Sequence, residues 1–320
     1  MDHLDLSIII PIFNEEDNII LLYEKLTAVT ASLNKETEII AVNDGSNDRS
    51  QALLEELAEK DASFKVIEFR RNSGQTAAMM AGIDHSLGEV IITIDADLQN
   101  DPEDIPLLLE ALDRGADVVS GWRKDRQDNA IKRNFPSRVA NRLISFVSGV
   151  KLHDYGCSLK AYKREVLLGQ RLYGEMHRFI PIYASWMGAK VVEVPVRHKK
   201  REFGVSNYGL ERVFKVILDL IVVKFLSSYF ARPIYFFGGF GLAAFAISIS
   251  ALLYMLYLKL FMSVSFILTP LPVLSAMFML IGVMCVFIGI LAELVIRTYF
   301  ESQGGRTYIL KATHNITAKT

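Results

Sequence analysis

The sequence predicts an α/β domain with a mostly parallel sheet, followed by two helices that cross a membrane. Over the first half of the 320-residue chain, short apolar runs rich in β-branched residues alternate with amphipathic stretches. Such alternation favours right-handed crossovers and a mostly parallel sheet that helices cover on both faces. Charged residues make up 22% of the chain but become rare after Lys224, where long apolar runs begin. We therefore expect a polar N-terminal domain and a membrane-embedded C-terminal part.

The individual elements follow from the same pattern. Strands are predicted at residues 6–12, 38–43, 65–69, 89–94 and 117–121, with helices at 17–33 and 76–86 and a further helix that ends at Lys60. Ligands of parallel sheets bind beyond the carboxyl ends of the strands. The residues that follow each predicted strand are therefore the candidates for a functional site.

Composition excludes several classes of protein. The net charge of −1 provides no overall field for nucleic acid or anionic lipid. The acidic start of the chain lacks the basic flank and cleavage site of a secretory signal, so the N-terminal domain is expected to stay in the cytoplasm. Cys157 and Cys285 are the only cysteines, which excludes a disulfide framework and a four-cysteine zinc site.

Two nearly uncharged runs, at residues 233–258 and 271–296, predict transmembrane helices. Each is roughly 25 residues long, enough to cross a hydrocarbon core of about 30 Å. A buried helical hairpin of a soluble protein is the alternative, but such helices rarely stay apolar on every face. Positive residues favour the cytoplasmic side, which places both ends of the pair in the cytoplasm and the loop outside. The flanking positive residues are Lys224, Arg232, Arg297, Arg306 and Lys311.

The segment before the first span has its own pattern. The charges of residues 211–219 recur at helical spacing and predict an amphipathic helix on the membrane surface. A helix packed on the soluble domain is the alternative. The predicted organisation is a cytoplasmic domain at 1–207, interfacial helices at 208–232, spans at 233–258 and 271–296, and a cytoplasmic tail at 297–320.

Carboxylates follow three of the predicted strands, and the pair Asp95 and Asp97 is the most informative. These two like charges flank a single residue at the end of an apolar strand, an unfavourable arrangement unless a cation neutralises it. Carboxylate oxygens suit Mg²⁺ or Mn²⁺, and a nucleotide diphosphate would complete the coordination. A helix N-cap is the alternative, and it explains Asp101 better than the pair. No Gly-x-Gly-x-x-Gly turn or Gly-Lys-Ser/Thr phosphate loop is present, which disfavours a dinucleotide-binding fold.

Several motifs, in order, resemble the signature of inverting family-2 glycosyltransferases. They are Pro11-x-x-Asn14-Glu15, Asn43-Asp44-Gly45-Ser46, Arg71-Asn72-Ser73-Gly74-Gln75 and Asp95-Ala96-Asp97-Leu98-Gln99. Segments 154–164 and 201–208 resemble dolichyl-phosphate mannose synthases and the bacterial undecaprenyl-phosphate glucose and aminoarabinose transferases, the last most of all. The resemblance covers essentially the whole chain.

The resemblance implies a nucleotide-sugar-binding domain of the GT-A type and roles for individual residues. The nucleoside would be held by Pro11, Phe13, Glu15 and Asp44, and the metal and diphosphate by Asp95, Asp97 and Gln99, with Ala96 between the acids. Arg123 and Arg201 would meet phosphates, since guanidinium forms bidentate hydrogen bonds with them. Arg133 and Arg138 are further candidates for the lipid phosphate, unless their basic stretch is simply a solvated face. Asn207 departs from the family's usual Lys, a cation that Lys199 or Lys200 could supply.

The implied reaction is inverting transfer of one sugar from a nucleotide-sugar, with a UDP-sugar preferred, to polyprenyl (undecaprenyl) phosphate. Asp154 is interpreted as a positioning residue for acceptor or sugar, with a loop-capping role as the alternative. A processive polysaccharide synthase is a rival function, although its Gln-x-x-Arg-Trp motif is absent; a non-catalytic membrane scaffold is another. The expected protein is a multi-pass enzyme of the cytoplasmic membrane, with its catalytic domain and both termini in the cytoplasm. It does not bind nucleic acid, and a homo-oligomer formed through the membrane helices is compatible with the resemblance.

Overall fold

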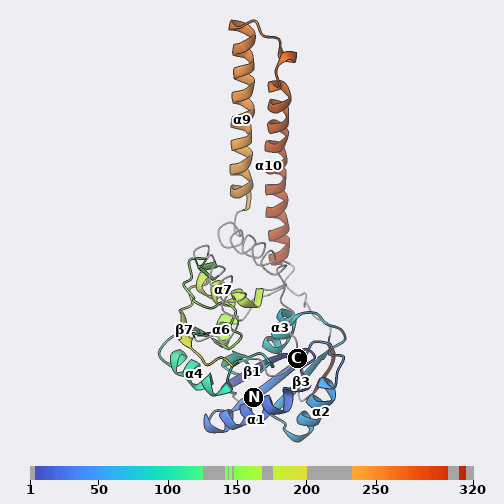
Figure 1. Cartoon of the computed structure of the whole chain (residues 1–320), viewed down its shortest axis with the longest axis vertical. Coiled ribbons are helices and arrows are strands. Elements are labelled where there is room, and N and C mark those ends of the chain that lie inside the picture. Colours follow the sequence, from blue (N-terminus) through green and yellow to red (C-terminus); the bar gives the residue numbers. More distant parts are fainter. Residues whose placement is uncertain are drawn as a thin grey trace. The chain divides into compact units, whose positions relative to one another are not determined.

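A computed structural model describes residues 4–124, 141–142, 144–145, 148–167, 176–199, 233–301 and 310–314. The chain divides into two units (Figure 1). The first comprises Met1–Leu220 together with Arg306–Thr320, and the second comprises Ile221–Gly305. The predicted interfacial helices at 208–232 lie outside the described residues.

An eight-stranded sheet forms the centre of the first unit, in the order β7-β5-β6-β4-β1-β2-β3-β8. Six strands run parallel, and β6 and β8 run antiparallel to their neighbours. The strands are β1 Leu6–Ile12, β2 Thr37–Asn43, β3 Phe64–Phe69, β4 Val90–Thr93, β5 Val118–Trp122, β6 Lys160–Lys163, β7 Val191–Pro195 and β8 Leu310–His314. The mostly parallel sheet predicted from the sequence is confirmed.

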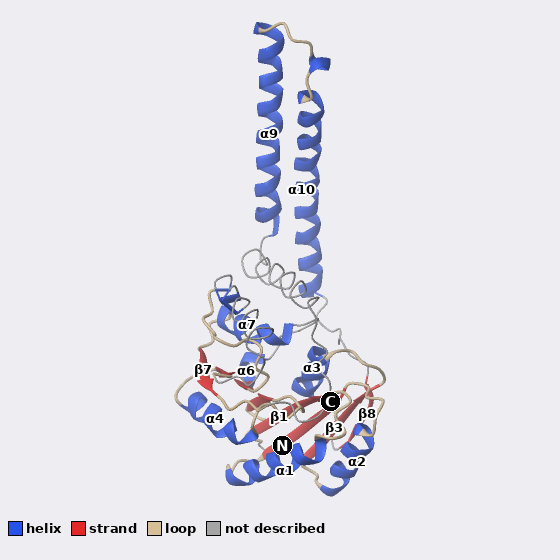
Figure 2. Ribbon diagram, in the orientation of Figure 1, coloured by secondary structure: helices blue, strands red, loops and turns tan. Residues whose placement is uncertain are grey.

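Helices cover both faces of this sheet (Figure 2). The inward apolar faces of α1, α2 and α4 pack on one side of the strands, and α3, α6 and α7 pack on the other. Isoleucines of β1 alternate between the two cores, as expected for a strand that is buried on both faces. The helices are α1 Ile19–Ser32, α2 Ser50–Lys60, α3 Gln75–His85, η1 Pro102–Asp104, α4 Ile105–Asp113, α6 Arg164–Leu167, η3 Met176–Phe179 and α7 Ile180–Trp186.

The second unit contains two long helices, α9 Pro233–Phe261 and α10 Leu271–Glu301, joined by the short helix η4 Phe266–Leu268. Residues 234–261 and 271–295 are long and apolar enough to cross a membrane. Small residues let the helices approach each other: a Cβ atom on Gly282 would lie 2.6 Å from the ring of Phe245. Ser248 and Ser275 also exchange hydrogen bonds, each hydroxyl donating to the other residue's carbonyl, at 2.8 and 3.1 Å.

Strand β8 was not predicted. The sequence analysis treated residues 297–320 as a tail, whereas residues 310–314 pair with β3 in the register Ile67 with Thr313 and Glu68 with Ala312. The strand therefore covers what would otherwise be the open edge of β3, where unpaired backbone groups invite association with other chains.

We predict that the double substitution Ala312→Pro/Thr313→Pro destabilises the first unit. Adjacent residues of a strand point their N–H groups in opposite directions, so one of the two prolines removes a hydrogen bond to β3. A decrease of about 2 kcal/mol in the free energy of unfolding would lower Tm by roughly 4–8 °C. The measurement is thermal unfolding of the detergent-purified protein. The control Ala312→Val/Thr313→Val keeps both N–H groups and strand propensity. An unchanged Tm for the proline variant would contradict the role assigned to β8.

Candidate active site

The carboxyl ends of the parallel strands bring most of the predicted site residues to one edge of the sheet. Phe13 and Glu15 follow β1, Asp44 follows β2, the acidic pair follows β4, and Arg123 follows β5. Strand β6 runs the other way, so the residues that precede it reach the same edge. Predicted residues far apart in the chain are thereby collected at the topological position where parallel sheets bind ligands.

The loops after β1 and β2 are joined by hydrogen bonds between side chains and backbone. The Asn14 N–H donates to Ser46 Oγ at 2.9 Å, and the Asn47 N–H donates to Asn14 Oδ1 at 2.8 Å. Asn14 has a positive φ of 55°, a conformation that asparagine tolerates better than most residues. The pairing leaves the Phe13 ring 42% exposed at this edge, where a planar base could stack on it.

Asp44 holds the segment that leads into α3. Its two carboxylate oxygens accept the N–H groups of Ser73 at 2.6 Å and Gly74 at 2.9 Å. Gly45, with a φ of 69°, allows this approach, because a Cβ atom there would lie 2.6 Å from the Arg71 carbonyl carbon. Burial raises the pKa of Asp44, although the two backbone hydrogen bonds act to lower it. In the free protein Asp44 thus fixes a loop, a role that was not predicted for it.

Asp95 and Asp97 are close enough to repel each other. Burial and the neighbouring Asp97 carboxylate raise the pKa of Asp95 to about 6. Gln75, the first residue of α3, donates its side-chain N–H to Asp95 Oδ1 at 2.6 Å. Ser158 Oγ accepts the Asp95 N–H at 3.3 Å. Asp95 is therefore held through its carboxylate by Gln75 and through its backbone N–H by Ser158, while the like charges of the pair remain only partly balanced.

The backbone turns sharply directly after the acidic pair. Strand β4 ends at Thr93, before the acidic pair, so the alternation of side chains along a strand does not orient the two acids. Leu98 is buried with a φ of 57°, which is strained for a residue with a branched side chain. The Gln99 N–H donates to Asp97 Oδ1 at 3.1 Å and closes the turn. Strain of this kind concentrates at functional sites.

The residues present fit a divalent cation that is only partly held by protein. Two repelling carboxylates offer hard oxygen ligands, as Mg²⁺ and Mn²⁺ require. Among the described residues no group of three or more His, Cys, Asp or Glu side chains gathers around a common point. A cation at Asp95 and Asp97 would therefore take its other ligands from water or from the phosphates of a bound molecule.

Arg123 and Asp154 form a buried bidentate ion pair. Arg123 Nε donates to Asp154 Oδ2 at 2.6 Å, and a terminal guanidinium nitrogen donates to Oδ1 at 2.9 Å. Oδ1 also accepts the Gly156 N–H at 3.0 Å. Burial alone would lower the pKa of Arg123, but the hydrogen bonds and charge of Asp154 outweigh it, so the pKa is raised. Asp154 therefore caps its own loop, as the alternative prediction held, and also pairs with Arg123, a contact that was not predicted.

Sequence reasoning missed three residues that support the acidic pair: Gln75, Ser158 and Lys160. Lys160 is buried, and its ammonium donates to the carbonyl oxygens of Tyr155 and Cys157. Burial lowers its pKa, and its charge acts to lower the pKa of Asp95. All three residues fall within motifs or segments that the sequence singled out, which was the available signal.

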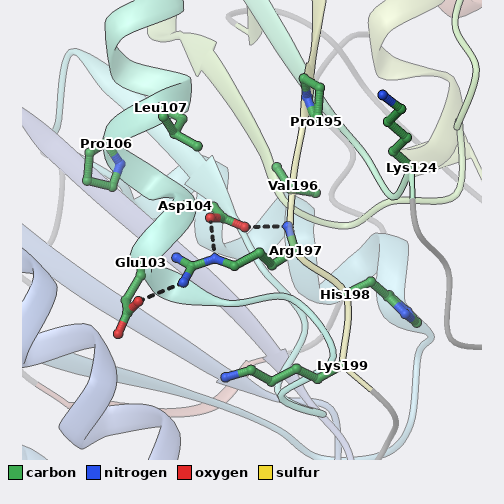
Figure 3. A pocket seen from close by; sticks show the side chains of 10 residues that line it. All are labelled: Glu103, Asp104, Pro106, Leu107, Lys124, Pro195, Val196, Arg197, His198 and Lys199. Atoms are coloured by element: carbon green, nitrogen blue, oxygen red, sulfur yellow. Dashed lines mark hydrogen bonds and ion pairs between the residues drawn. The ribbon is translucent and has the colours of Figure 1, made fainter.

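A cleft of about 800 Å³ lies between the start of α4 and the segment after β7 (Figure 3). Arg197 in this cleft donates to Asp104 Oδ1 at 2.8 Å and to Glu103 Oε2 at 2.9 Å. Lys199, considered above as a substitute cation, pairs with Asp101 at 2.8 Å. Asp101 also accepts the Glu103 N–H, which confirms it as the cap of η1.

Three further predicted residues lie at or near this edge of the sheet, and others fall outside the described part of the chain. Pro11 lies within β1, and Glu15 Oε2 accepts the Asn18 side-chain amide at 2.6 Å. Ala96 is buried between the two acids. Arg133, Arg138, Lys200, Arg201 and Asn207 lie outside the described residues.

Comparison with known proteins gives a consistent result. A family model described as glycosyl transferase family 2 matches residues 7–169. Dodecaprenyl-phosphate galacturonate synthase of Rhizobium johnstonii is 42% identical over 312 residues, which cover 96% of this chain and 92% of that protein. Undecaprenyl-phosphate 4-deoxy-4-formamido-L-arabinose transferase of Edwardsiella ictaluri is 38% identical over 307 residues, which cover 95% of this chain and 93% of that protein.

Solved structures agree in fold. Glucosyl-3-phosphoglycerate synthase from Mycobacterium tuberculosis, in complex with Mn²⁺, UDP and glucosyl-3-phosphoglycerate, matches with a TM-score of 0.51. The match covers 70% of this chain and 80% of that one at 17% identity, so it supports the fold alone.

We predict that Asp95→Asn stabilises the metal-free protein while it weakens metal binding. The pKa of Asp95 is raised to about 6 in the folded protein. At any pH above its pKa in the unfolded chain, ionisation of Asp95 therefore lowers the free energy of unfolding. With chelator at about pH 7 the variant should gain on the order of 1 kcal/mol, or about 2–4 °C in Tm, and this gain should shrink towards about pH 4.5.

Asp101→Asn is the matched control for this experiment. Burial would raise the pKa of Asp101, but hydrogen bonds from Lys199 and the Glu103 N–H lower it. This substitution should therefore destabilise the protein at about pH 7. A lower Tm for Asp95→Asn under the same conditions would show that the Asp95 charge does not destabilise the metal-free protein.

Proposed function

The chain belongs to glycosyltransferase family 2, as its motifs predicted, and on that premise we propose that it transfers one sugar from a nucleotide-sugar to a polyprenyl phosphate. The observation that carries this proposal is the acidic pair Asp95 and Asp97 beside Arg123, at the ligand-binding edge of the sheet. The second unit supplies two helices suited to a membrane, where a polyprenyl acceptor resides. Relatives that match almost the whole chain are named for dodecaprenyl and undecaprenyl phosphate products or acceptors.

Each residue of the site has a place in the proposed reaction. Phe13 would stack on the base of the donor, and Asp95 and Asp97, with Gln99 nearby, would hold a divalent cation. That cation would neutralise charge on the departing nucleoside diphosphate. Arg123, pre-oriented by Asp154, would bind a phosphate group of donor or acceptor.

The acceptor needs positioning more than it needs a general base. A phosphate monoester has a second pKa near 6, so most of it is already ionised at neutral pH. Attack by its oxygen on the anomeric carbon, opposite to the departing diphosphate, would invert the configuration there. Asp154 is engaged with Arg123 through both carboxylate oxygens, which supports a positioning role in preference to proton transfer.

The donor is proposed to be a UDP-sugar. The two relatives are named for galacturonate and for formamidoarabinose, and UDP remains the preferred nucleotide of the motif resemblance. A galacturonate and a 4-formamido sugar differ in charge, so a panel of labelled donors would separate them in one experiment.

We also propose that both ends of the membrane hairpin face the cytoplasm. Strand β8 follows the second span and pairs with β3, which precedes the first span by many residues. Both strands belong to one folded unit, which supports a hairpin that returns the chain to the side from which it started. The positive residues at both ends favour the cytoplasmic side.

The transfer reaction is tested with detergent-purified protein, undecaprenyl phosphate and a panel of labelled UDP- and GDP-sugars, with Mg²⁺, Mn²⁺ or chelator. We expect metal-dependent label in the lipid phase from one donor. Asp97→Ala should abolish turnover, and Asp154→Ala should retain measurable activity, reduced about 10- to 100-fold. The control Asp113→Ala alters an exposed acid at the end of α4 that leads into the opposite edge of the sheet. Near-wild-type turnover by Asp97→Ala would refute the assignment of the acidic pair.

Topology is tested by labelling single cysteines in intact cells with a membrane-impermeant maleimide. Met262→Cys, in the loop between the spans, should react from outside, and Ala62→Cys, exposed on the first unit, should react only after permeabilisation. Native Cys157 is buried and Cys285 lies within α10, which limits background labelling. Labelling of Ala62→Cys in intact cells would reverse the proposed orientation.

A further inference from the structure

A largely buried carboxylate on β7, that of Glu193, contacts the loop that carries Asp154. Strand β7 lies parallel to β5 with Glu193 in register with Ser120, and the Glu193 side chain is only 11% exposed. Its Oε1 accepts the N–H groups of His153 at 2.8 Å and Asp154 at 2.9 Å. Its Oε2 lies 2.8 Å from Nδ1 of the His153 ring. One carboxylate thus accepts hydrogen bonds from two consecutive backbone N–H groups and also contacts the His153 imidazole.

The loop held in this way determines where the Arg123 guanidinium lies. With its backbone fixed by Glu193, Asp154 directs its carboxylate to Arg123 Nε and to a terminal nitrogen. Gly156 leaves the room that this pair needs, since a Cβ atom there would lie 3.1 Å from the guanidinium. Charge-assisted hydrogen bonds of this kind fix geometry more tightly than neutral ones.

A second contact fixes the same loop from the side of β5. The His153 ring stacks on Trp122, the residue before Arg123, with ring centroids 4.4 Å apart and planes inclined by 20°. Glu193 bonds to this imidazole as well as to the backbone, so it ties β7, the 153–154 loop and the end of β5 together. The loop is therefore held by contacts from two different strands, β5 and β7.

We infer that Glu193 is a positioning residue of the glycosyltransferase site: it holds the 153–154 loop so that Asp154 orients Arg123 toward a bound phosphate group. This inference rests on the proposed function. Glu193 itself does not meet substrate, and its effect passes through Arg123. A purely structural role would instead lower the stability of the first unit without a specific effect on the Arg123 guanidinium.

The test compares Glu193→Gln and Glu193→Ala with Glu110→Gln, a control that alters an exposed glutamate paired with Arg114. We expect kcat to fall about tenfold for Glu193→Gln, which keeps an acceptor oxygen, with little change in donor KM or in Tm. We expect kcat to fall about 100-fold for Glu193→Ala, which also lowers Tm because the His153 and Asp154 N–H groups lose their acceptor. In an Arg123→Gln background, Glu193→Gln should reduce kcat no further, because the residue through which it acts is already lost. Independent, multiplicative losses in the two backgrounds would overturn the inference.

A second readout needs no turnover. In protein with ¹⁵N-labelled arginine, the Nε–H signal of Arg123, assigned by its loss in Arg123→Gln, should exchange slowly in wild type and in Glu110→Gln. It should exchange faster in both Glu193 variants, because the Asp154 partner is no longer held in place. Unchanged protection in Glu193→Ala would refute the positioning role even if no donor supported transfer. An inactive wild type with the expected exchange behaviour would refute the proposed reaction instead.

Discussion

The repulsion between Asp95 and Asp97 is the constraint on which the rest of the site depends. Two partly desolvated carboxylates side by side are unfavourable, and the raised pKa of Asp95 expresses that cost. The fold offsets it with groups from separate elements: the Gln75 amide from α3, the Ser158 hydroxyl from the turn before β6, and the Lys160 ammonium within β6. These groups meet because β6 runs antiparallel between β4 and β5 and starts at the edge where they end. The sheet order thus makes an otherwise unstable acidic pair tolerable in the free protein and leaves it suited to a cation.

Hydrogen bonds to backbone N–H groups, more than apolar packing, give this edge its shape. Asn14 binds the loop after β2, Asp44 binds the segment that begins α3, and Asp154 and Glu193 bind the loop before β6. Each acceptor is already held by hydrogen bonds, so little side-chain freedom remains to be lost when a ligand binds. A site arranged in this way is preorganised for a charged ligand, since its donors and acceptors are already oriented before the ligand arrives. The strained φ of Leu98 belongs to the same arrangement, because the surrounding hydrogen bonds hold a turn that the residue alone would avoid.

Sequence patterns predicted the strands from β1 to β5 because each is a continuous apolar run that ends at a polar turn. They also predicted the acidic pair, because two like charges separated by one residue at a strand end have few structural explanations. The supporting roles of Ser158 and Lys160 could not be predicted, since they depend on β6 inserting between β4 and β5, a pairing of distant segments that no local pattern records. Strand β8 was missed for a related reason: five residues after a membrane span resemble a tail until the open edge of β3 is known. The sequence likewise indicated that Asp154 belongs to the site but not that Arg123 occupies both of its oxygens.

Strand β8 also bears on how a soluble domain can serve a lipid acceptor. A polyprenyl phosphate is confined to the bilayer, whereas a nucleotide-sugar diffuses in water, so the enzyme must keep its site within reach of both. A single chain connection between the domain and its membrane helices would leave many relative orientations accessible. The pairing of β8 with β3 adds a second connection after the second span, because residues on both sides of the hairpin then belong to one folded unit. A segment attached at both ends has less conformational freedom than one attached at a single end, and under the proposed function this would raise the effective concentration of the site near a lipid acceptor. Under the proposed function, the pairing of β8 with β3 would thus serve transfer to a lipid from the edge of the sheet that carries no site residue.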